Sequence, residues 1–479
     1  MTAKAQKSKM VAFWQTVGMR FLPFADAATA DLPLGRLLRL SMFQLSVGMA
    51  AVLLTGTLNR VMIVELGVPA SLVAIMIALP VLAAPLRVLI GHRSDTYKSV
   101  LGWRRVPYLW LGTLLQFGGL AIMPFSLLLM QSQTLGPEWA GPAAAAFAFL
   151  LTGLGMHMAQ TAGLALATDL AAPESRPRVV ALVYVVLLLG MIFASLAFGA
   201  LLSDFSATRL IGVVQGAAVL TVLVNVVALW KQEVRNPQAT HADRDMPSFK
   251  EAWSRYRADR STGRLLLAVA LGSAAFSMQD VLLEPFGGEI LGLSVSQTTL
   301  LTAAWASGAL IGFGLAGKLL HLGFNMHRVA ALGALIGIAA FTAVILSSPL
   351  GSTLLFVVGV TLIGIGGGLF AVATMLAAMA LADKSDSGFA IGAWSAVQAT
   401  AIGVGLAAGG IIRDTVNAAA TSGELGQTLD TAVTGYNTVY HLEIFLLFVS
   451  LVVIGPLTNR ANGRTAPVTR QFGLAELPG

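Results

Sequence analysis

Long apolar runs recur along the whole sequence, and they constrain the fold more than any other feature. An α-helix needs about 20 apolar residues to cross a hydrocarbon core of ~30 Å, whereas membrane β-strands are about 10 residues long and alternate in polarity. The runs here are long and do not alternate, and only 11% of the residues are charged, against roughly 25% in soluble domains. The sequence therefore predicts an all-α membrane protein. We predict 12 transmembrane helices, at 36–59, 69–92, 106–130, 142–168, 178–202, 208–230, 265–290, 297–320, 327–347, 352–380, 388–411 and 437–457.

The longest polar interval between these helices is Lys231–Arg264, which carries eight Lys and Arg residues and has six predicted helices on either side. Ahead of the first helix, lysines and then spaced apolar residues favour an interfacial helix over a signal peptide, because no small-residue cleavage site follows. The chain has no cysteine, which excludes disulfides and thiolate metal sites. The predicted organisation is a cytoplasmic or interfacial N-terminus at 1–35, an N-terminal six-helix bundle at 36–230, a cytoplasmic linker at 231–264, a C-terminal six-helix bundle at 265–457 and a cytoplasmic tail at 458–479.

The positive charges indicate the orientation of the helices, because cytoplasmic loops of membrane proteins are enriched in Lys and Arg. With the N-terminus inside, 27 of the 30 Lys and Arg residues fall on the cytoplasmic side, and Arg60, Arg209 and Arg413 fall outside. Both termini are therefore predicted to be cytoplasmic. The net charge of +7 is then explained by a membrane surface and its lipids, with no nucleic-acid partner.

The two halves of the chain resemble each other. The stretch Arg178–Asp204 ends in GALLSD and the equally long Gly388–Asp414 ends in GGIIRD, while a Leu-Gly pair at 66–67 has a counterpart at 291–292. Offsets of about 210–225 residues fit two pseudo-symmetric six-helix bundles, as in the major facilitator fold. Glycines four residues apart would let helices approach closely. These pairs are Gly308/Gly312, Gly364/Gly368 and Gly405/Gly409.

The loop after the second predicted helix carries Gly91, Asp95, Gly102, Arg104 and Arg105. A glycine, an acid four residues later, and then a glycine with paired arginines resemble the loop signature of major facilitator transporters, stretched by several residues. The resemblance implies that the acid and the arginines pair with helix ends and bias a cytoplasmic gate. The alternative is a positively charged inside loop with no other duty.

More specific similarity appears in five stretches, at 54–69, 90–110, 111–125, 152–184 and 282–295. Together they resemble the PucC/LhaA family of photosynthetic bacteria over nearly the whole chain. The resemblance implies a facilitator relative that is not an enzyme, and that handles bacteriochlorophyll a and assists assembly of light-harvesting antenna complexes, with the core antenna LH1 favoured as the client. It further implies an intracytoplasmic photosynthetic membrane as the location, antenna polypeptides as partners, the reaction centre and pigment-synthesis enzymes as further candidates, and carotenoid or quinone as additional ligands.

Candidate pigment ligands lie within the predicted helices, where polar side chains are costly unless they face the bundle or a ligand. The imidazole of His157 is a potential axial ligand for the pigment Mg²⁺, although a packing histidine bonded to a neighbouring helix is an equally open reading. Gln160 lies one turn along on the same face. Gln116, Asn59 and Gln398 are further candidates, each of which would also serve as a hydrogen-bonding residue between helices.

Three acids near helix ends are candidates for structural or coupling roles. Asp169 closes the fourth predicted helix, where pairing with loop arginines is the simplest account. Asp280 and Glu284 lie four residues apart in the seventh helix and are candidates for ion coupling, because intramembrane acids often mark proton sites. Pro285 and the glycines after it also predict a helix break there, which would place both acids at the membrane surface.

Two function classes follow. In the first, the protein holds or delivers bacteriochlorophyll during antenna assembly; in the second, it is an ion-coupled secondary transporter of a small solute. A third class, a prenyltransferase acting on pigment tails, is excluded because such enzymes need clustered carboxylates for Mg²⁺ and diphosphate. Here Asp383 and Asp386 form an isolated pair.

Overall fold

The computed structural model describes the helical body of the chain. The described residues are 32–83, 103, 105–131, 137, 139–172, 175–233, 260–381 and 387–461. Within them all regular structure is helical, which confirms the all-α fold class.

The helices of the first half are α2 (Leu34–Ser41), α3 (Phe43–Ala51), η2 (Val52–Leu58), η3 (Val61–Glu65), α4 (Ala70–Leu82), α6 (Val106–Gln131), α7 (Ala140–Leu170), α8 (Arg176–Leu201) and α9 (Ala207–Leu229). Those of the second half are α11 (Arg260–Ser277), η7 (Met278–Val281), α12 (Leu283–Glu289), α13 (Val295–His321), α14 (Met326–Ser347), α15 (Thr353–Leu381), α16 (Ser387–Thr421) and α17 (Val433–Ala461). Here η2 and η3 are π-helical and η7 is a 3₁₀-helix.

Eleven spans in the described residues are long and apolar enough to cross a membrane, and α4 is a shorter apolar helix at the second predicted position. The first span, Leu34–Glu65, runs as one rod through α2, α3, η2 and η3. The protein is therefore a multi-pass membrane protein, as the hydrophobic runs predict.

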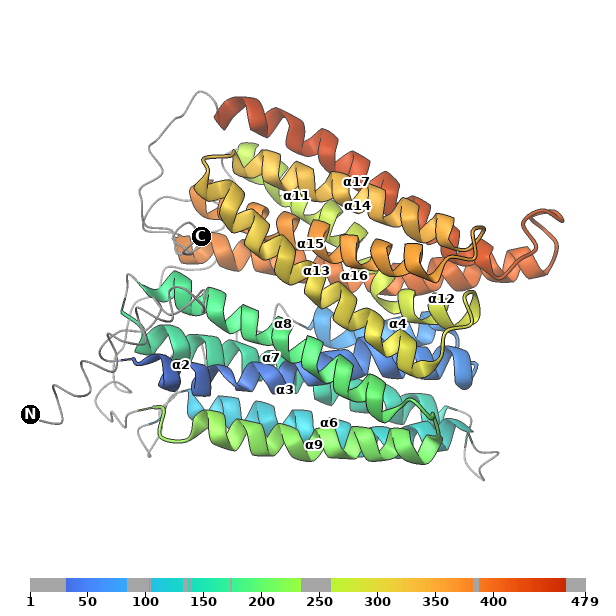
Figure 1. Ribbon diagram of the computed structural model, residues 1–479, viewed down its shortest axis with the longest axis horizontal. Helices are drawn as coiled ribbons and strands as arrows, with labels where there is room; N and C mark the ends of the chain where they lie inside the picture. Colours follow the sequence, from blue (N-terminus) through green and yellow to red (C-terminus); the bar gives the residue numbers. More distant parts are fainter. Residues whose placement is uncertain are drawn as a thin grey trace, which may run out of the picture.

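The helices form two groups that follow the order of the chain. In the first group α6 packs against α7 and α9, and α3 against α8 and α9; in the second, α15 packs against α13 and α14, and α11 against α16 and α17. The groups meet through two helix pairs, α4 with α16 and α8 with α13. Figure 1 shows the first group in the lower half of the view and the second above it.

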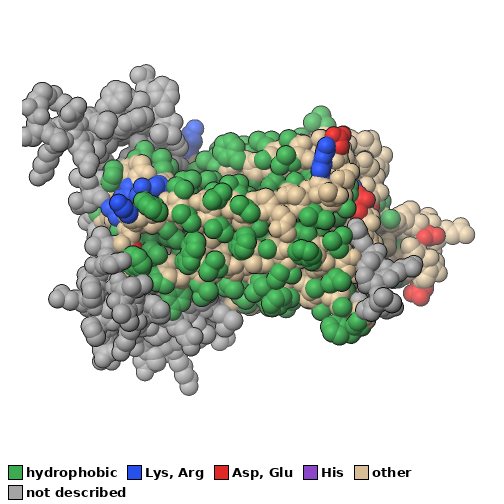
Figure 2. Space-filling model, turned by 90° about the horizontal axis from the view of Figure 1, so that it is seen from below, with side chains coloured by type: hydrophobic (Ala, Val, Ile, Leu, Met, Phe, Trp, Pro, Cys, Tyr) green, Lys and Arg blue, Asp and Glu red, His purple; other side chains and the backbone are tan. Residues whose placement is uncertain are grey.

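The two ends of this bundle are named here by their chain connections. At the linker end, α9 finishes at Leu229 and α11 begins at Arg260. The far end is the opposite one, where α12 finishes and where the extended α16 projects beyond its neighbours (Figure 1). Figure 2 shows a face covered largely by hydrophobic side chains between ends at which charged side chains gather, the arrangement expected of a lipid-facing surface.

Matching turns close the first spans of the two halves at the far end. Gly67 has φ +65° and Gly292 has φ +67°. The following amides, of Val68 and Leu293, each donate to a carbonyl six residues earlier, on Met62 and Gly287. This is a helix-closing motif that favours glycine, because other residues rarely adopt positive φ. The paired Leu-Gly positions thus have one structural role in both halves.

Small residues bring α13 and α15 into backbone contact. A Cβ placed on Gly308 would lie 2.1 Å from the carbonyl oxygen of Thr361, and one on Gly364 would lie 2.2 Å from that of Trp305. The two glycine pairs predicted to permit close approach therefore face each other across the α13–α15 contact. Gly405 and Gly409 serve the same purpose where α16 meets Ser277 and Met278.

Several helix boundaries differ from prediction, most of all those of the seventh span and of α16. The break in the seventh span lies at Met278–Val281, before the predicted position, and α12 continues through Pro285 to Glu289. Pro285 is the third residue of α12, where its missing N–H has no intrahelical partner to lose, so it starts the helix instead of breaking it. At the other extreme, α16 continues ten residues past its predicted end, to Thr421.

Candidate functional site

Helix α7, which carries His157, is fixed closely on three sides. A Cβ on Gly155 would lie 2.4 Å from the backbone nitrogen of Gln116 in α6. On the other sides, Gly153 meets the ring of Pro80 in α4 and Gly163 meets the ring of Phe43 in α3. The position of α7 is thus set by backbone and ring contacts that leave no room for larger side chains.

The remaining face of α7 is partly exposed. Residues at helical spacing along it are all of intermediate exposure: Leu150, Leu154, His157, Thr161, Leu164 and Thr168. Gln160, one turn from His157, is also partly exposed. The hydroxyl of Thr161 donates to the carbonyl of His157 at 2.8 Å, so its polar atom is satisfied within the helix. An imidazole and a carboxamide therefore lie close together on a mainly apolar, partly exposed face, with the Nε2 atom of His157 itself shielded from solvent.

The other three pigment-ligand candidates lie elsewhere. Gln116 is fully buried behind α7, and its Nε2 donates to the carbonyl of Ser46 at 2.7 Å. Asn59 is fully buried at the junction of the two helix groups, and Gln398 is partly exposed on α16. The structure thus brings together His157 and Gln160, which share one helix, and does not gather all five candidates in one cluster.

At the linker end, Asp169 takes part in an arginine–acid pair that bridges two helices. Arg105 Nε lies 3.0 Å from Asp169 Oδ2, so Asp169 pairs with the loop before α6. The carboxylate of Glu233 accepts the backbone N–H groups of Arg105 and Val106 at 2.9–3.2 Å. An acid at a helix N-terminus is favoured by the helix dipole. The other four residues of the loop motif, Gly91, Asp95, Gly102 and Arg104, lie outside the described residues.

At the far end, a buried arginine ties three helices together. Arg413 of α16 lies 2.6 Å from Glu289 at the end of α12 and 2.9 Å from Asp414. Tyr436 of α17 donates to the same Glu289 carboxylate at 2.8 Å. Asp414 in turn accepts the backbone N–H of Ser71 at the start of α4, at 2.7 Å. These charge-assisted bonds hold the second group together and join it to the first.

Further contacts join the two groups toward the far end. Arg60 forms an ion pair with Glu65 and donates to the carbonyl of Leu293 at 3.2 Å. The hydroxyls of Thr57 and Thr299 lie 3.2 Å apart across the junction. Of the three arginines that the charge count predicts to be outside, Arg60 and Arg413 are buried with acidic partners, whereas Arg209 is exposed and paired with Asp204.

The two coupling candidates differ in burial, Glu284 lying inside the protein and Asp280 at a partly exposed position. Glu284 is 7% exposed and accepts the hydroxyl of Thr302 at 3.2 Å. Asp280, which accepts from the side chain of Gln279, is partly exposed. The amide nitrogen of Asn59 lies 3.4 Å from the backbone carbonyl of Asp280. The helix break expected at Pro285 is absent there, because α12 continues through it to Glu289, and Glu284 is buried against neighbouring helices.

Glu443 of α17 is a further acid in the same region, and the sequence patterns do not single it out. It is fully buried, and it approaches the backbone of Gln279 and the side chain of Asp280. The signal was available, because an acid within the apolar run of the twelfth helix marks a functional candidate by the same rule that selected Asp280.

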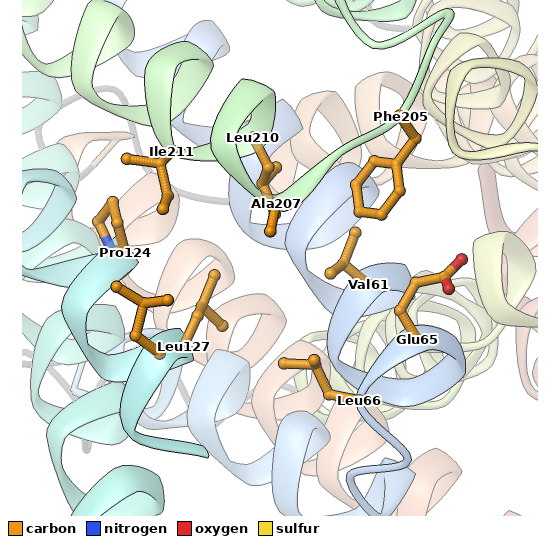
Figure 3. A pocket seen from close by; sticks show the side chains of 10 residues that line it. Val61, Glu65, Leu66, Pro124, Leu127, Phe205, Ala207, Leu210 and Ile211 are labelled. Atoms are coloured by element: carbon orange, nitrogen blue, oxygen red, sulfur yellow. The ribbon is translucent and has the colours of Figure 1, made fainter. Parts of the chain in front are cut away.

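A cavity of about 200 Å³ lies between η3, α6 and α9 at the far end. Figure 3 shows that its lining is mainly aliphatic and aromatic, with Glu65 as its one charged residue. It is smaller than the roughly 300–1,000 Å³ typical of pockets for small-molecule ligands, and no candidate site residue lines it. We therefore do not place a pigment there.

Solved transporter structures share the fold. The chain is similar to a bacterial homologue of the human lysosomal transporter Spinster in an inward-facing and occupied conformation, with a TM-score of 0.68 and 16% identity over 90% of this chain and 98% of that one. It is also similar to a peptide transporter of the POT family in complex with sulfate, with a TM-score of 0.64 and 15% identity over 89% and 95% of the two chains. The fold is therefore the two-bundle major facilitator fold.

Sequence relatives are much closer. An uncharacterised protein of the puhA-bchM intergenic region of Rhodobacter capsulatus is 55% identical over 97% of this chain and 98% of its own length. Protein PucC of Rhodovulum sulfidophilum is 56% identical over 84% and 90% of the two chains. The bacteriochlorophyll synthase 44.5 kDa chain of Rhodobacter capsulatus is 30% identical over 77% and 85%. A family model described as PUCC protein matches residues 57–462. The chain therefore belongs to the PucC family of photosynthetic membrane proteins.

Proposed function

We propose that this protein is an assembly factor that binds bacteriochlorophyll and delivers it to light-harvesting antenna polypeptides, with the core antenna LH1 as the client. Membership of the PucC family supports this, as does similarity to a relative whose name refers to bacteriochlorophyll synthase. The site of action would be the intracytoplasmic photosynthetic membrane, with both termini in the cytoplasm.

The observation that carries the proposal is the placement of His157. Its helix is fixed by close packing on three sides, while His157 and Gln160 lie on the partly exposed fourth. Bacteriochlorophyll is a large apolar macrocycle whose Mg²⁺ takes an axial nitrogen or oxygen ligand. The donor set fits such a group, since a neutral imidazole can bind the metal and a carboxamide can donate to a ring carbonyl.

The protein's own part in this mechanism is to bind and orient. The apolar residues on the partly exposed face of α7 would cover the macrocycle, and the tight α6–α7 contact would keep the imidazole in place. We infer no catalytic step, so the protein would act as a carrier and not as an enzyme. A carotenoid or quinone is a further candidate ligand, and the reaction centre and pigment-synthesis enzymes are further candidate partners.

A second candidate function, ion-coupled transport of a small solute, is favoured by one observation. Asp280 and Glu284 lie at the junction of the two helix groups, where major facilitator proteins bind substrates and coupling ions. The absorption spectrum of the protein purified in mild detergent separates the two candidates. A bound bacteriochlorin supports the assembly factor, and a colourless protein with solute-stimulated uptake supports the transporter.

His157→Leu tests the ligand assignment. It removes the metal ligand while keeping a side chain that a membrane helix tolerates, so folding should persist and the ratio of bacteriochlorophyll to protein should fall together with the antenna level. His441→Leu is the matched control, because His441 is an exposed histidine of α17 that hydrogen-bonds the carbonyl of Asn437 in its own helix. An unchanged ratio in His157→Leu would contradict the assignment of this ligand, and the loss of a single interhelical hydrogen bond, about 0.6 kcal/mol, would then be its main effect.

A further inference from the structure

Glu443 is an acid in an unusual setting. It lies ten residues into α17, about 15 Å along the helix from the far end, and its side chain is fully buried. Neither carboxylate oxygen makes a hydrogen bond of normal geometry within the described residues. An ionised carboxylate without a partner is very costly in a low-dielectric interior, so a neutral, protonated carboxyl is the stable form.

Its neighbours are other acids and hydroxyls. Glu443 lies where α17 packs against η7, near the backbone of Gln279 and within electrostatic range of Asp280. Tyr440, one turn earlier on α17, is fully buried and interacts with both Glu443 and Glu284. Three carboxyl groups, from η7, α12 and α17, therefore share one buried region.

Acceptor oxygens in this region outnumber the available donors. The side-chain oxygens of Asn59 and Gln279 are fully buried and have no hydrogen-bond partner in the described part of the chain. With the two oxygens of Glu443, four buried acceptors lack a partner in the described residues, against three donors: the Tyr440 hydroxyl and the Nε groups of Arg60 and Arg413. Both arginines form their ion pairs with other acids, Arg60 with Glu65 and Arg413 with Glu289 and Asp414. Added protons would turn carboxyl acceptors into donors and so correct this imbalance.

A proton fits this region better than a metal ion does. Among the described residues, no group of three or more His, Cys, Asp or Glu side chains is close enough to hold a metal. The charged group that interacts with Glu443 itself is Asp280, while Glu284 and Arg413 interact with the neighbouring Tyr440. The charged residues of α11 and α14, Arg264, His327 and Arg328, lie in the first turns of those helices, at the linker end.

The backbone around the acids is irregular in both halves. The first span changes to π-helix on either side of Asn59, and the seventh span changes to 3₁₀-helix at Asp280. The two irregular segments contact each other through Asn59 and the carbonyls of Asp280 and Val281. Local departures from α-helix often mark functional hinges, and broken helices at a repeat interface are typical of transporter ion sites.

We propose that Asp280, Glu284 and Glu443 form an intramembrane proton-binding site, in which Glu443 carries a proton in the conformation described here. Proton binding converts a carboxylate into a carboxylic acid and requires no other reactant. Release of this proton would introduce a negative charge beside Asp280 and loosen the contact between η7 and the first span. The site goes beyond the proposed assembly function and does not depend on which cargo the protein carries.

Infrared difference spectroscopy of the purified full-length protein tests the site directly. As the pH is raised, the wild type should lose a carbonyl band of protonated carboxylic acids, and Glu443→Gln should lack at least about a third of that band, because one of three carboxyls is gone. Glu424→Gln, which removes an exposed acid of the far loop, should match the wild type. A carboxamide has the shape of a protonated carboxyl, so Glu443→Gln should also fold normally. A band that is unchanged, or a Glu443→Gln protein that fails to fold, would overturn the proposal.

A second measurement reports the loosening of the junction. The chain has no native cysteine, so Thr57→Cys with Thr299→Cys provides a single thiol pair across it. Membrane-permeant iodine oxidises this pair to a disulfide. As the pH is raised, the rate of this oxidation in the protein with native Glu443 should become several-fold slower than the rate of the same pair in Glu443→Gln. The comparison at each pH cancels the pH dependence of thiol chemistry. Identical pH profiles in the two backgrounds would refute a link between this proton and the junction, whatever the pigment content of the protein.

Discussion

Replacing Gly155 with alanine should separate α6 from α7 beside the candidate pigment ligand. The added Cβ would lie 2.4 Å from the backbone nitrogen of Gln116 and 2.6 Å from the carbonyl oxygen of Gly112, whereas ordinary contact begins at 3.4 Å. The helices must therefore move apart by about 1 Å, because both obstacles are backbone atoms that cannot rotate away. Overpacking of this kind typically costs about 1–3 kcal/mol.

Gly118→Ala is the matched control, since a Cβ at Gly118 meets nothing within 4 Å and lies on α6 itself. Thermal unfolding in detergent, followed by size-exclusion chromatography, should show a lower unfolding midpoint for Gly155→Ala than for the wild type. The midpoint of Gly118→Ala should not be lowered. The bacteriochlorophyll-to-protein ratio should fall in the same variant, because His157 lies two residues further along α7. Equal stability of the two variants would refute the packing argument. A lower unfolding midpoint with an unchanged pigment content would refute the link between the position of α7 and pigment binding.

Two further perturbations probe the ends of the bundle. Replacing Asp95, or Arg104 and Arg105 together, should lower the level of assembled antenna, because the predicted role of this loop is conformational. The pigment content of the purified protein should stay unchanged. Pigment loss with an intact fold would contradict that role. Arg413→Gln should destabilise the protein by roughly 3 kcal/mol, the low end for a broken buried ion pair since Glu289 remains partly exposed. Arg209→Gln, which breaks an exposed pair at the same end, should cost under about 1 kcal/mol in the same unfolding assay.

Hydrophobic length predicts the membrane spans well but not where helices end. The eleventh predicted helix, at 388–411, corresponds to α16 and continues to Thr421. The residues beyond include Arg413, Asp414 and Asn417, which end the apolar run without ending the helix. Hydropathy detects the edge of the hydrocarbon core, whereas a helix ends where its backbone meets a turn.

The break in the seventh span shows a second limit of sequence patterns. Proline stops a helix in its interior but is accommodated in the first turn, and the pattern around Pro285 does not distinguish these cases. The 3₁₀ segment before it contacts Asn59, which comes from the other half of the chain. Local sequence carries no information on that partner.

The candidate site residues differ in how far sequence could place them. His157 and Gln160 are neighbours because of helical spacing, which sequence gives directly. Gln116 is turned toward Ser46 by the packing of three helices, and Asp169 forms an ion pair with Arg105, which lies 64 residues away in the sequence. Such partners follow from tertiary packing, and no pattern in one sequence specifies them.

Transfer of pigment from this protein to its client tests the central claim most directly. The purified protein, loaded with bacteriochlorophyll, would be mixed with pigment-free core antenna polypeptides in detergent, and the near-infrared absorption of assembled antenna followed in time. Delivery predicts that the antenna band grows as the carrier loses pigment, faster than with an equal amount of free pigment, and that His157→Leu loses this advantage. Pigment that never binds the protein, or antenna that forms equally fast without it, would contradict the claim.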